Sequence, residues 1–216
     1  ASQYGFAVYA IAAQAAGATL VQAPALSATV AMARGHDLDA LAAAITPRTK
    51  LVYLANPNNP TGTWFGMEAL RAFLARVPRN VIVVVDEAYA EFNEEGGSAL
   101  AFTAAHPNLV VTRTFSKAYA LAGLRIGFAV GHPRLVAVME RVRESFNVNS
   151  LALAACEAAL GDEEHLAWSR ERNAKQRGAL TDALRARGLH VLPSQTNFVL
   201  ARFGERTPAI EAALLE

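Results

Sequence analysis

Two hydroxyls and a lysine lie within the four residues Thr114-Phe115-Ser116-Lys117, soon after the apolar run Leu109-Val110-Val111. Arg125 follows eight residues after the lysine, just before a second apolar run. A lysine in a partly desolvated pocket near another cation loses basicity, so its free amine can attack a carbonyl and form a Schiff base. An arginine and hydroxyls are suited to holding a phosphate. The stretch therefore predicts that Lys117 is a Schiff-base lysine and that Thr114, Ser116 and Arg125 bind a phosphate.

Two further polar clusters follow apolar runs in the same way. Leu51-Val52-Tyr53-Leu54-Ala55 leads into a loop over 56–62 that holds two prolines and three asparagines, and Val81-Ile82-Val83-Val84-Val85 ends at Asp86. Continuous apolar runs of this length are typical of strands that are covered on both faces. Strands, polar loops and helices alternate, which predicts an α/β fold with a largely parallel sheet. Ligands bind beyond the carboxyl ends of such strands, so we expect the three clusters to form one site.

The remaining segments complete the expected fold. An Ala-rich helix should end at Gly17, and Asp37 is suited to capping the next helix. A shift in composition near Gly161, with short strands after Gly188, indicates a large domain over 1–160 and the start of a smaller α+β domain over 161–216. The other expected elements are helices over 68–76, 133–143, 151–160, 163–187 and 207–215, and strands over 18–23, 126–130, 189–192 and 197–200.

Composition narrows the classes of function. The chain has 216 residues, 53% of them apolar, a formal charge of +1 and no block of like charges, so nothing favours a nucleic-acid partner. No apolar run reaches the roughly 18 residues of a membrane span. The single cysteine, Cys156, predicts neither a disulfide framework nor a metal site, and is consistent with a reducing, cytoplasmic compartment. The start Ala1-Ser2-Gln3 has no initiator methionine and no signal-peptide pattern, so we expect an internal piece of a longer protein.

One cofactor matches the whole set of side chains. Pyridoxal 5'-phosphate is an aromatic nitrogen heterocycle that carries an aldehyde, a phenolic oxygen and a phosphate, and it serves as an electron sink when its ring nitrogen is held by a carboxylate. The expected contacts are a Schiff base with Lys117, an ion pair of Asp86 with the ring nitrogen, hydrogen bonds from Tyr89 and Asn59 to the phenolic oxygen, stacking of Tyr4 on the ring, and phosphate binding by Thr114, Ser116 and Arg125.

Each of these residues also has an ordinary structural role. Asp86 could cap a helix, Asn59 could serve only the turn, and Arg125 could form a surface ion pair. Tyr89 and Tyr4 could belong to the core. The joint occurrence of all of them in this order favours the cofactor.

The pattern resembles the fold-type I, class I/II aminotransferases. The residues that carry the resemblance are Asn59-Pro60-Thr61-Gly62, Asp86 with Tyr89, and Ser116-Lys117 followed by Arg125. The residues in and around these motifs, together with Pro193-Ser194-Gln195-Thr196-Asn197-Phe198, are most similar to those of the histidinol-phosphate aminotransferase family. The resemblance covers essentially the whole chain.

The resemblance implies a three-layer large domain, a small domain built from both chain ends, and a homodimer with the site at the subunit boundary. It implies an amino donor, L-histidinol phosphate, and a 2-oxo acid, 2-oxoglutarate, that react in histidine biosynthesis. Lys117, Asp86 and Tyr89 would be the catalytic residues, and Lys117 would move a proton between the substrate α-carbon and cofactor C4′. The family's N-terminal substrate tyrosine, its glycine loop and its C-terminal substrate arginines are expected outside residues 1–216.

Three alternatives remain beside this hypothesis. Threonine-phosphate decarboxylases and aromatic or alanine aminotransferases share the cofactor residues. A fragment that binds the cofactor without turnover would carry the same motifs. A dinucleotide-binding protein would also be α/β, but the Gly-x-Gly-x-x-Gly turn that it needs is not in the sequence.

Overall fold

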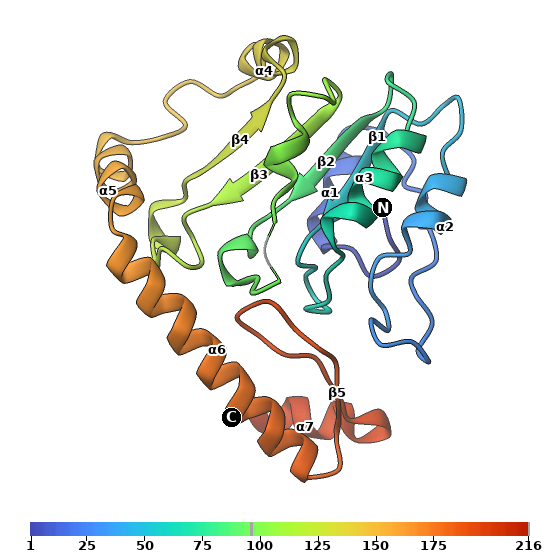
Figure 1. Ribbon diagram of the computed structural model, residues 1–216, viewed down its shortest axis with the longest axis vertical. Coiled ribbons are helices and arrows are strands. Elements are labelled where there is room, and N and C mark those ends of the chain that lie inside the picture. Colours follow the sequence, from blue (N-terminus) through green and yellow to red (C-terminus); the bar gives the residue numbers. More distant parts are fainter. Residues whose placement is uncertain (96, 216) are drawn as a thin grey trace.

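The computed structural model describes residues 1–95 and 97–215, and its centre is a four-stranded sheet (Figure 1). The strands are β1 (Leu51–Ala55), β2 (Ile82–Asp86), β3 (Leu109–Thr114) and β4 (Gly127–Gly131), in the order β1-β2-β3-β4. β1, β2 and β3 are parallel, and β4 runs antiparallel to β3. The predicted α/β fold with a largely parallel sheet is confirmed.

Helices cover both faces of this sheet, so the fold has three layers. On one face, alternate residues of β1, β2 and β3 form the main core with Leu70, Phe73 and Leu74 of α3 (Met67–Arg76), and α2 (Leu38–Ala43) packs beside α3. On the other face lies α1 (Ala7–Ala15), behind the sheet in Figure 1. Because side chains alternate along a strand, Tyr53 of β1 points to the α1 face. Its ring stacks on Tyr9, with centroids 4.6 Å apart.

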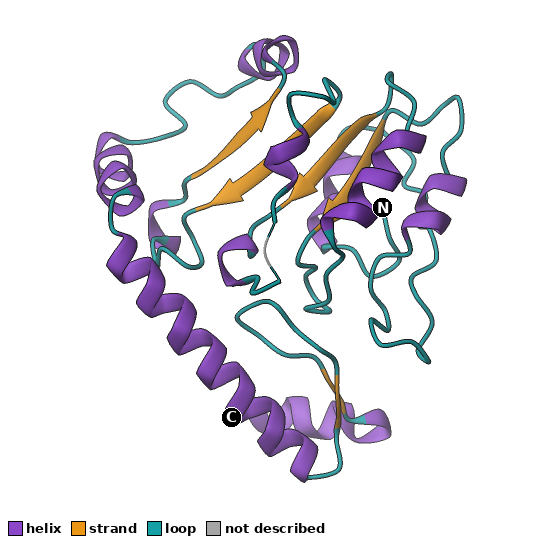
Figure 2. Cartoon of the chain, in the orientation of Figure 1, coloured by secondary structure: helices purple, strands orange, loops and turns teal. Residues whose placement is uncertain are grey.

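The C-terminal third is mostly helical (Figure 2). α4 (Pro133–Glu140) and α5 (Ser150–Leu160) follow β4, and α6 (Glu163–Ala186) extends away from the sheet toward a short antiparallel pair, β5 (His190–Val191) and β6 (Ala201–Arg202), and α7 (Thr207–Leu214). Among the described residues, four 3₁₀ helices complete the fold: η1 (Ala90–Phe92), η2 (Ala99–Phe102), η3 (Ala122–Leu124) and η4 (Gly204–Arg206). None of the described helices is long and apolar enough to cross a membrane.

Two expected strands are wrong. The segment 18–23 forms only an isolated bridge between Ala23 and Ser2, because its hydrogen bonds reach the first residues of the chain and no neighbouring strand. The segment 197–200 is not a strand either, because the hydroxyls of Ser194 and Thr196 both bond to the backbone of Phe198. Such side-chain bonds compete with a strand ladder, and the strand begins only at Ala201. The domain boundary at 160/161 falls between α5 and α6 and stays a prediction.

A buried histidine closes the end of β1. His36 is 7% exposed, and its Nε2 lies 3.1 Å from the amide nitrogen of Ala55, which donates to it, and 3.0 Å from the Ala55 carbonyl oxygen. Its other ring nitrogen, Nδ1, has no hydrogen-bond partner among the described residues. Burial lowers the pKa of His36 to about 4, because the charged imidazolium is poorly solvated there. The fold therefore requires a neutral ring at this position.

This histidine should make the stability of the fold depend on pH. In the unfolded chain His36 takes up a proton below its ordinary pKa of about 6.5, whereas the folded protein holds it neutral down to about 4. The unfolded state binds more protons in this window, so stability is lost as the pH falls through it, by about 2 kcal/mol between pH 7 and pH 5. The free energy of unfolding, measured with denaturant at pH 7 and at pH 5, should differ less between the two pH values in His36→Gln than in the parent chain, by about this amount. The exposed His190→Gln is the control, and an unchanged difference in His36→Gln would contradict the assignment.

Candidate active site

Three polar loops meet at the carboxyl edge of the sheet. The Asn59 side-chain nitrogen donates a 3.3 Å hydrogen bond to the Tyr89 hydroxyl, and Lys117 Nζ lies 5.4 Å from the centre of the Tyr89 ring. These residues follow β1, β2 and β3, as expected from the parallel strand order. The Tyr89 ring is fixed from another side by Phe198, edge to face at 5.3 Å. Lys117 is half-buried and forms no ion pair with any described carboxylate.

Asp86 ends β2 at the same edge, and both of its carboxylate oxygens accept hydrogen bonds. The Ala88 amide donates to Oδ1 at 3.2 Å, and the Tyr9 hydroxyl donates to Oδ2 at 3.0 Å. η1 begins only at Ala90, with Tyr89 at its N-cap position, so Asp86 does not cap that turn. Its carboxylate stays half-buried at the strand end, held by two neutral donors.

The three residues expected at a phosphate lie where β3 leaves the sheet and β4 enters it. Thr114 pairs with Gly127 across the two strands, and its hydroxyl accepts a hydrogen bond from the Ser116 amide at 3.1 Å. Arg125 is exposed and has a left-handed backbone, with φ +53°. Its Nη1 donates to the Ala122 carbonyl at 2.7 Å. The structure therefore brings these residues to one edge but turns part of the Arg125 guanidinium toward its own turn.

Tyr4 lies in the loop before α1. Its carbonyl accepts a 2.9 Å hydrogen bond from the Asn58 side chain, which joins it to the loop that carries Asn59. The Arg34 guanidinium lies over the Tyr4 ring, 5.3 Å from its centre. Tyr4 is therefore tied to the site through Asn58, and its stacking on a cofactor stays a prediction.

A buried charge network lies directly behind this edge. Glu87 follows Asp86, and because side chains alternate it points to the opposite side, where it is 1% exposed. Its Oε2 accepts hydrogen bonds from Arg113 Nε at 2.8 Å and from the Ser98 hydroxyl at 2.7 Å. Arg113 Nη1 also donates to Glu91 Oε1 at 2.9 Å. One guanidinium thus joins β3, the turn after β2 and the loop before η2.

Burial and the neighbouring charges shift the pKa values of Glu91 and Arg113 in this network. Burial raises the pKa of Glu91, and the charge and hydrogen bond of Arg113 only partly oppose that shift. Glu91 Oε2 has no hydrogen-bond partner among the described residues. Burial also acts to lower the pKa of Arg113, but Glu87 and Glu91 outweigh it, so that the pKa of Arg113 is raised. Arg113 stays charged while two carboxylates share it.

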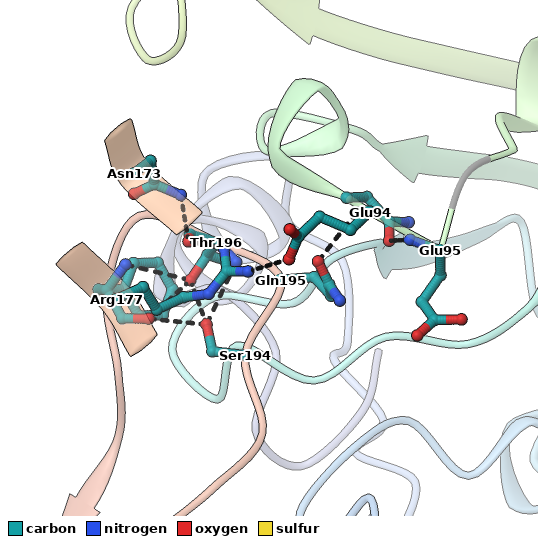
Figure 3. Close-up of polar contacts among 9 residues, drawn as sticks. Glu94, Glu95, Asn173, Arg177, Ser194, Gln195 and Thr196 are labelled. Carbon is teal, nitrogen blue, oxygen red and sulfur yellow. Dashed lines mark hydrogen bonds and ion pairs between the residues drawn. The ribbon is translucent and has the colours of Figure 1, made fainter. Parts of the chain in front are cut away.

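The loop over 193–198 is held against the edge by polar contacts (Figure 3). The Gln195 amide donates to the Gly62 carbonyl at 3.0 Å, and its side-chain oxygen accepts from the Glu94 amide at 2.9 Å. Arg177 of α6 bonds to the Thr196 carbonyl at 2.9 Å and to the Glu94 carboxylate at 2.5 Å. Gly62 has φ +77°, and a Cβ there would lie 2.5 Å from the Ser194 hydroxyl. Only glycine fits this approach, and the contacts place Phe198 against Tyr89.

Sequence reasoning missed several residues of this region. Tyr9, Glu87, Glu91, Arg113 and Phe198 had no assigned role, although most of them stand within or beside the motifs. Strand alternation was a usable signal, because it places Asp86 and Glu87 on opposite sides. Nothing local to Tyr9, which lies 77 residues from Asp86, points to their contact.

Fold and site together define a class of protein. The chain belongs to the class I and II aminotransferases, because a family model described as "Aminotransferase class I and II" matches residues 1–216.

The more particular similarities are to histidinol-phosphate aminotransferases. The chain is 53% identical over 210 residues to "Histidinol-phosphate aminotransferase 2" of Ralstonia nicotianae, covering 96% of this chain and 54% of that protein. It is 50% identical over 216 residues to the protein of that name from Pseudomonas aeruginosa, covering 99% of this chain and 57% of that one. The chain thus spans about half the length of these curated relatives.

Solved structures of aminotransferases are also similar to this chain. The histidinol-phosphate aminotransferase of Sinorhizobium meliloti, in complex with pyridoxal-5'-phosphate, matches with a TM-score of 0.89 and 33% identity, over 98% of this chain and 56% of that one. A mutant aspartate aminotransferase of Thermus thermophilus matches with a TM-score of 0.83 and 27% identity, over 95% of this chain and 57% of that one.

The buried network predicts a large effect of one substitution on stability. Arg113→Met leaves the Glu87 carboxylate, with a side chain 2% exposed, without its cation. Breaking a buried ion pair by removing one partner costs about 3–5 kcal/mol. We expect denaturant unfolding at pH 7 to show a loss of this size. Arg71→Met removes an exposed pair with Glu68 as the matched control, and should cost less than about 1 kcal/mol. Similar losses in both variants would contradict the role of Arg113.

Proposed function

We propose that this chain is the cofactor-binding part of a pyridoxal-phosphate-dependent aminotransferase. The proposed reaction transfers an amino group from L-histidinol phosphate to 2-oxoglutarate, giving imidazole acetol phosphate and L-glutamate, in histidine biosynthesis. The observation that carries the proposal is the meeting of Lys117, Tyr89 and Asn59, which come from three separate loops. The names of the relatives support the amino donor.

The chemistry of the side chains fits this cofactor. The site offers a lysine amino group that pairs with no described carboxylate, a phenol with an amide beside it, and a carboxylate at a strand end. These groups match an aldehyde, a phenolic oxygen and a ring nitrogen, and the Thr114, Ser116 and Arg125 side chains offer donors to a phosphate. When bound, the cofactor supplies a carbonyl for the amino group and a ring that accepts an electron pair.

The residues of the chain have distinct roles in the proposed reaction. Lys117 Nζ would be the base that takes a proton from the substrate α-carbon and delivers it to cofactor C4′. Asp86, held by two neutral hydrogen-bond donors, would pair with the ring nitrogen of the cofactor. Tyr89 and Asn59 orient the phenolic oxygen. Phe198 packs edge to face with the Tyr89 ring and holds it in place.

Other activities share this site. A threonine-phosphate decarboxylase or another class I/II aminotransferase would use the same cofactor residues, and a chain of this length could bind the cofactor without turnover. The relatives named histidinol-phosphate aminotransferase favour the first proposal. The homodimer and the cytoplasmic location rest on the resemblance and on the single cysteine.

Lys117→Ala tests the nucleophile. With pyridoxal phosphate, the parent chain should develop an absorbance band of the lysine-bound cofactor, because the free amine condenses with the aldehyde. The variant should lack the band, and far-UV circular dichroism should show the same fold. Lys175→Ala, which removes the other lysine of the C-terminal half, is the matched control and should keep the band.

The same spectra test the substrate. Addition of L-histidinol phosphate should convert the band to that of the amine form of the cofactor. If the band does not change when this amino donor is added, the cofactor assignment stands and the substrate assignment is refuted. A band retained by Lys117→Ala would refute the nucleophile.

Asp86→Asn should weaken cofactor binding. The substitution keeps the shape of the side chain but removes the charge that pairs with the ring nitrogen. Hydrogen bonds to charged groups contribute about 1.5–3 kcal/mol, so the Kd should rise roughly tenfold to a hundredfold. A fluorescence titration with pyridoxal phosphate measures it, with the exposed Asp182→Asn as control. Equal Kd values for Asp86→Asn and the parent chain would exclude the assigned role.

A further inference from the structure

Aromatic contacts hold the Tyr9 side chain of α1 in one position. Tyr9 is the buried residue of α1, whose other large apolar side chains, Val8 and Ile11, are 48% and 62% exposed. Its ring stacks on Tyr53 with an interplanar angle of 3° and meets Phe6 edge to face at 5.9 Å. Two aromatic contacts in perpendicular planes fix the position of the phenol oxygen. That oxygen lies 3.0 Å from Asp86 Oδ2.

The hydrogen bond has a defined direction. Burial, and then the charge of Asp86, raises the pKa of Tyr9 far above its ordinary value, so the hydroxyl keeps its proton and donates. The Ala88 amide donates to the other oxygen, Oδ1. Each Asp86 oxygen therefore has one fixed donor, and the plane of the carboxylate is set from two sides. A carboxylate oxygen accepts more than one hydrogen bond, so each keeps capacity for a further donor.

We propose that Tyr9 is a positioning residue, whose hydroxyl holds the Asp86 carboxylate in the orientation in which it meets the ring nitrogen of the cofactor. This inference rests on the proposed function and adds to it a residue from α1, on the far side of the sheet from the main core. Tyr9 acts through Asp86 and does not itself contact the reacting atoms. Tyr53 supports the Tyr9 ring and makes no hydrogen bond to Asp86.

A purely structural role would look different. If the bond served only to attach α1 to the sheet, its loss would loosen the whole edge and weaken any ligand there equally. If it orients Asp86, its loss weakens only ligands that offer a ring nitrogen. The distinction can be measured with two probes, pyridoxal phosphate and its 1-deaza analogue, in which carbon replaces the ring nitrogen.

The experiment is a calorimetric titration of both probes into the parent chain, Tyr9→Phe and Tyr53→Phe. Tyr9→Phe keeps the stacked ring and removes only the hydroxyl. We expect it to raise the Kd of pyridoxal phosphate roughly tenfold, the size expected for a lost hydrogen bond to a charged group, and to change the Kd of the deaza analogue less than about twofold. Tyr53→Phe keeps the stack and the Tyr9 hydroxyl, so both Kd values should stay within about twofold of the parent chain.

The outcomes separate the two levels of the proposal. Equal changes for both probes in Tyr9→Phe, or no change for either, would overturn the positioning role and leave the cofactor assignment standing. A parent chain that binds pyridoxal phosphate no better than the deaza analogue would overturn the Asp86 contact, and the role of Tyr9 with it. Failure of the parent chain to bind either probe would overturn the proposed function itself.

Discussion

The ion pair between Arg113 and Glu87 is the interaction on which the arrangement of the site depends. Arg113 stands in β3, one residue before Thr114, and Glu87 stands one residue after Asp86. Their contact, shared with Glu91 and Ser98, fixes the ends of two neighbouring strands relative to each other. Burying these charges costs desolvation, which the hydrogen bonds on Nε, Nη1 and Nη2 must offset. Arginine suits this role better than lysine, because its guanidinium presents five N–H donors in a fixed planar fork.

Strand alternation divides the work between adjacent residues. Asp86 points to the α1 face and receives the Tyr9 hydroxyl, whereas Glu87 points away and receives Arg113. The strand register places Asp86 opposite Ala55 of β1 and Thr112 of β3. A one-residue slip of β2 would exchange the two carboxylates and place the structural one at the edge. The apolar run before Asp86 therefore determines which carboxylate lies at the edge of the sheet, and it also supplies side chains to the core.

The sheet and the meeting of its polar loops were predictable, because continuous β-branched runs and the order of parallel strands are local signals. Asn59, Tyr89 and Lys117 converge as predicted from that order. The error at 18–23 has a different origin, since an extended segment becomes a strand only where a partner strand is present. The role of Tyr9 could not be predicted either, because it also depends on a partner that is distant in the sequence. Its contact depends on how α1 packs across Tyr53, and nothing near Tyr9 in the sequence encodes that distance.

The charges near Asp86 are arranged so that its own charge stays available. Arg113 is the cation held close to the β2 turn, and Glu87 and Glu91 occupy it on the opposite side. No ion pair joins Asp86 to a cation within the described residues, and its partners are the neutral Tyr9 hydroxyl and Ala88 amide. A carboxylate held by neutral donors is oriented without being neutralised, which suits the proposed contact of Asp86 with the ring nitrogen of a cofactor. Glu87 thus pairs with the arginine on one side of the strand, whereas Asp86 is held by neutral hydrogen-bond donors on the other.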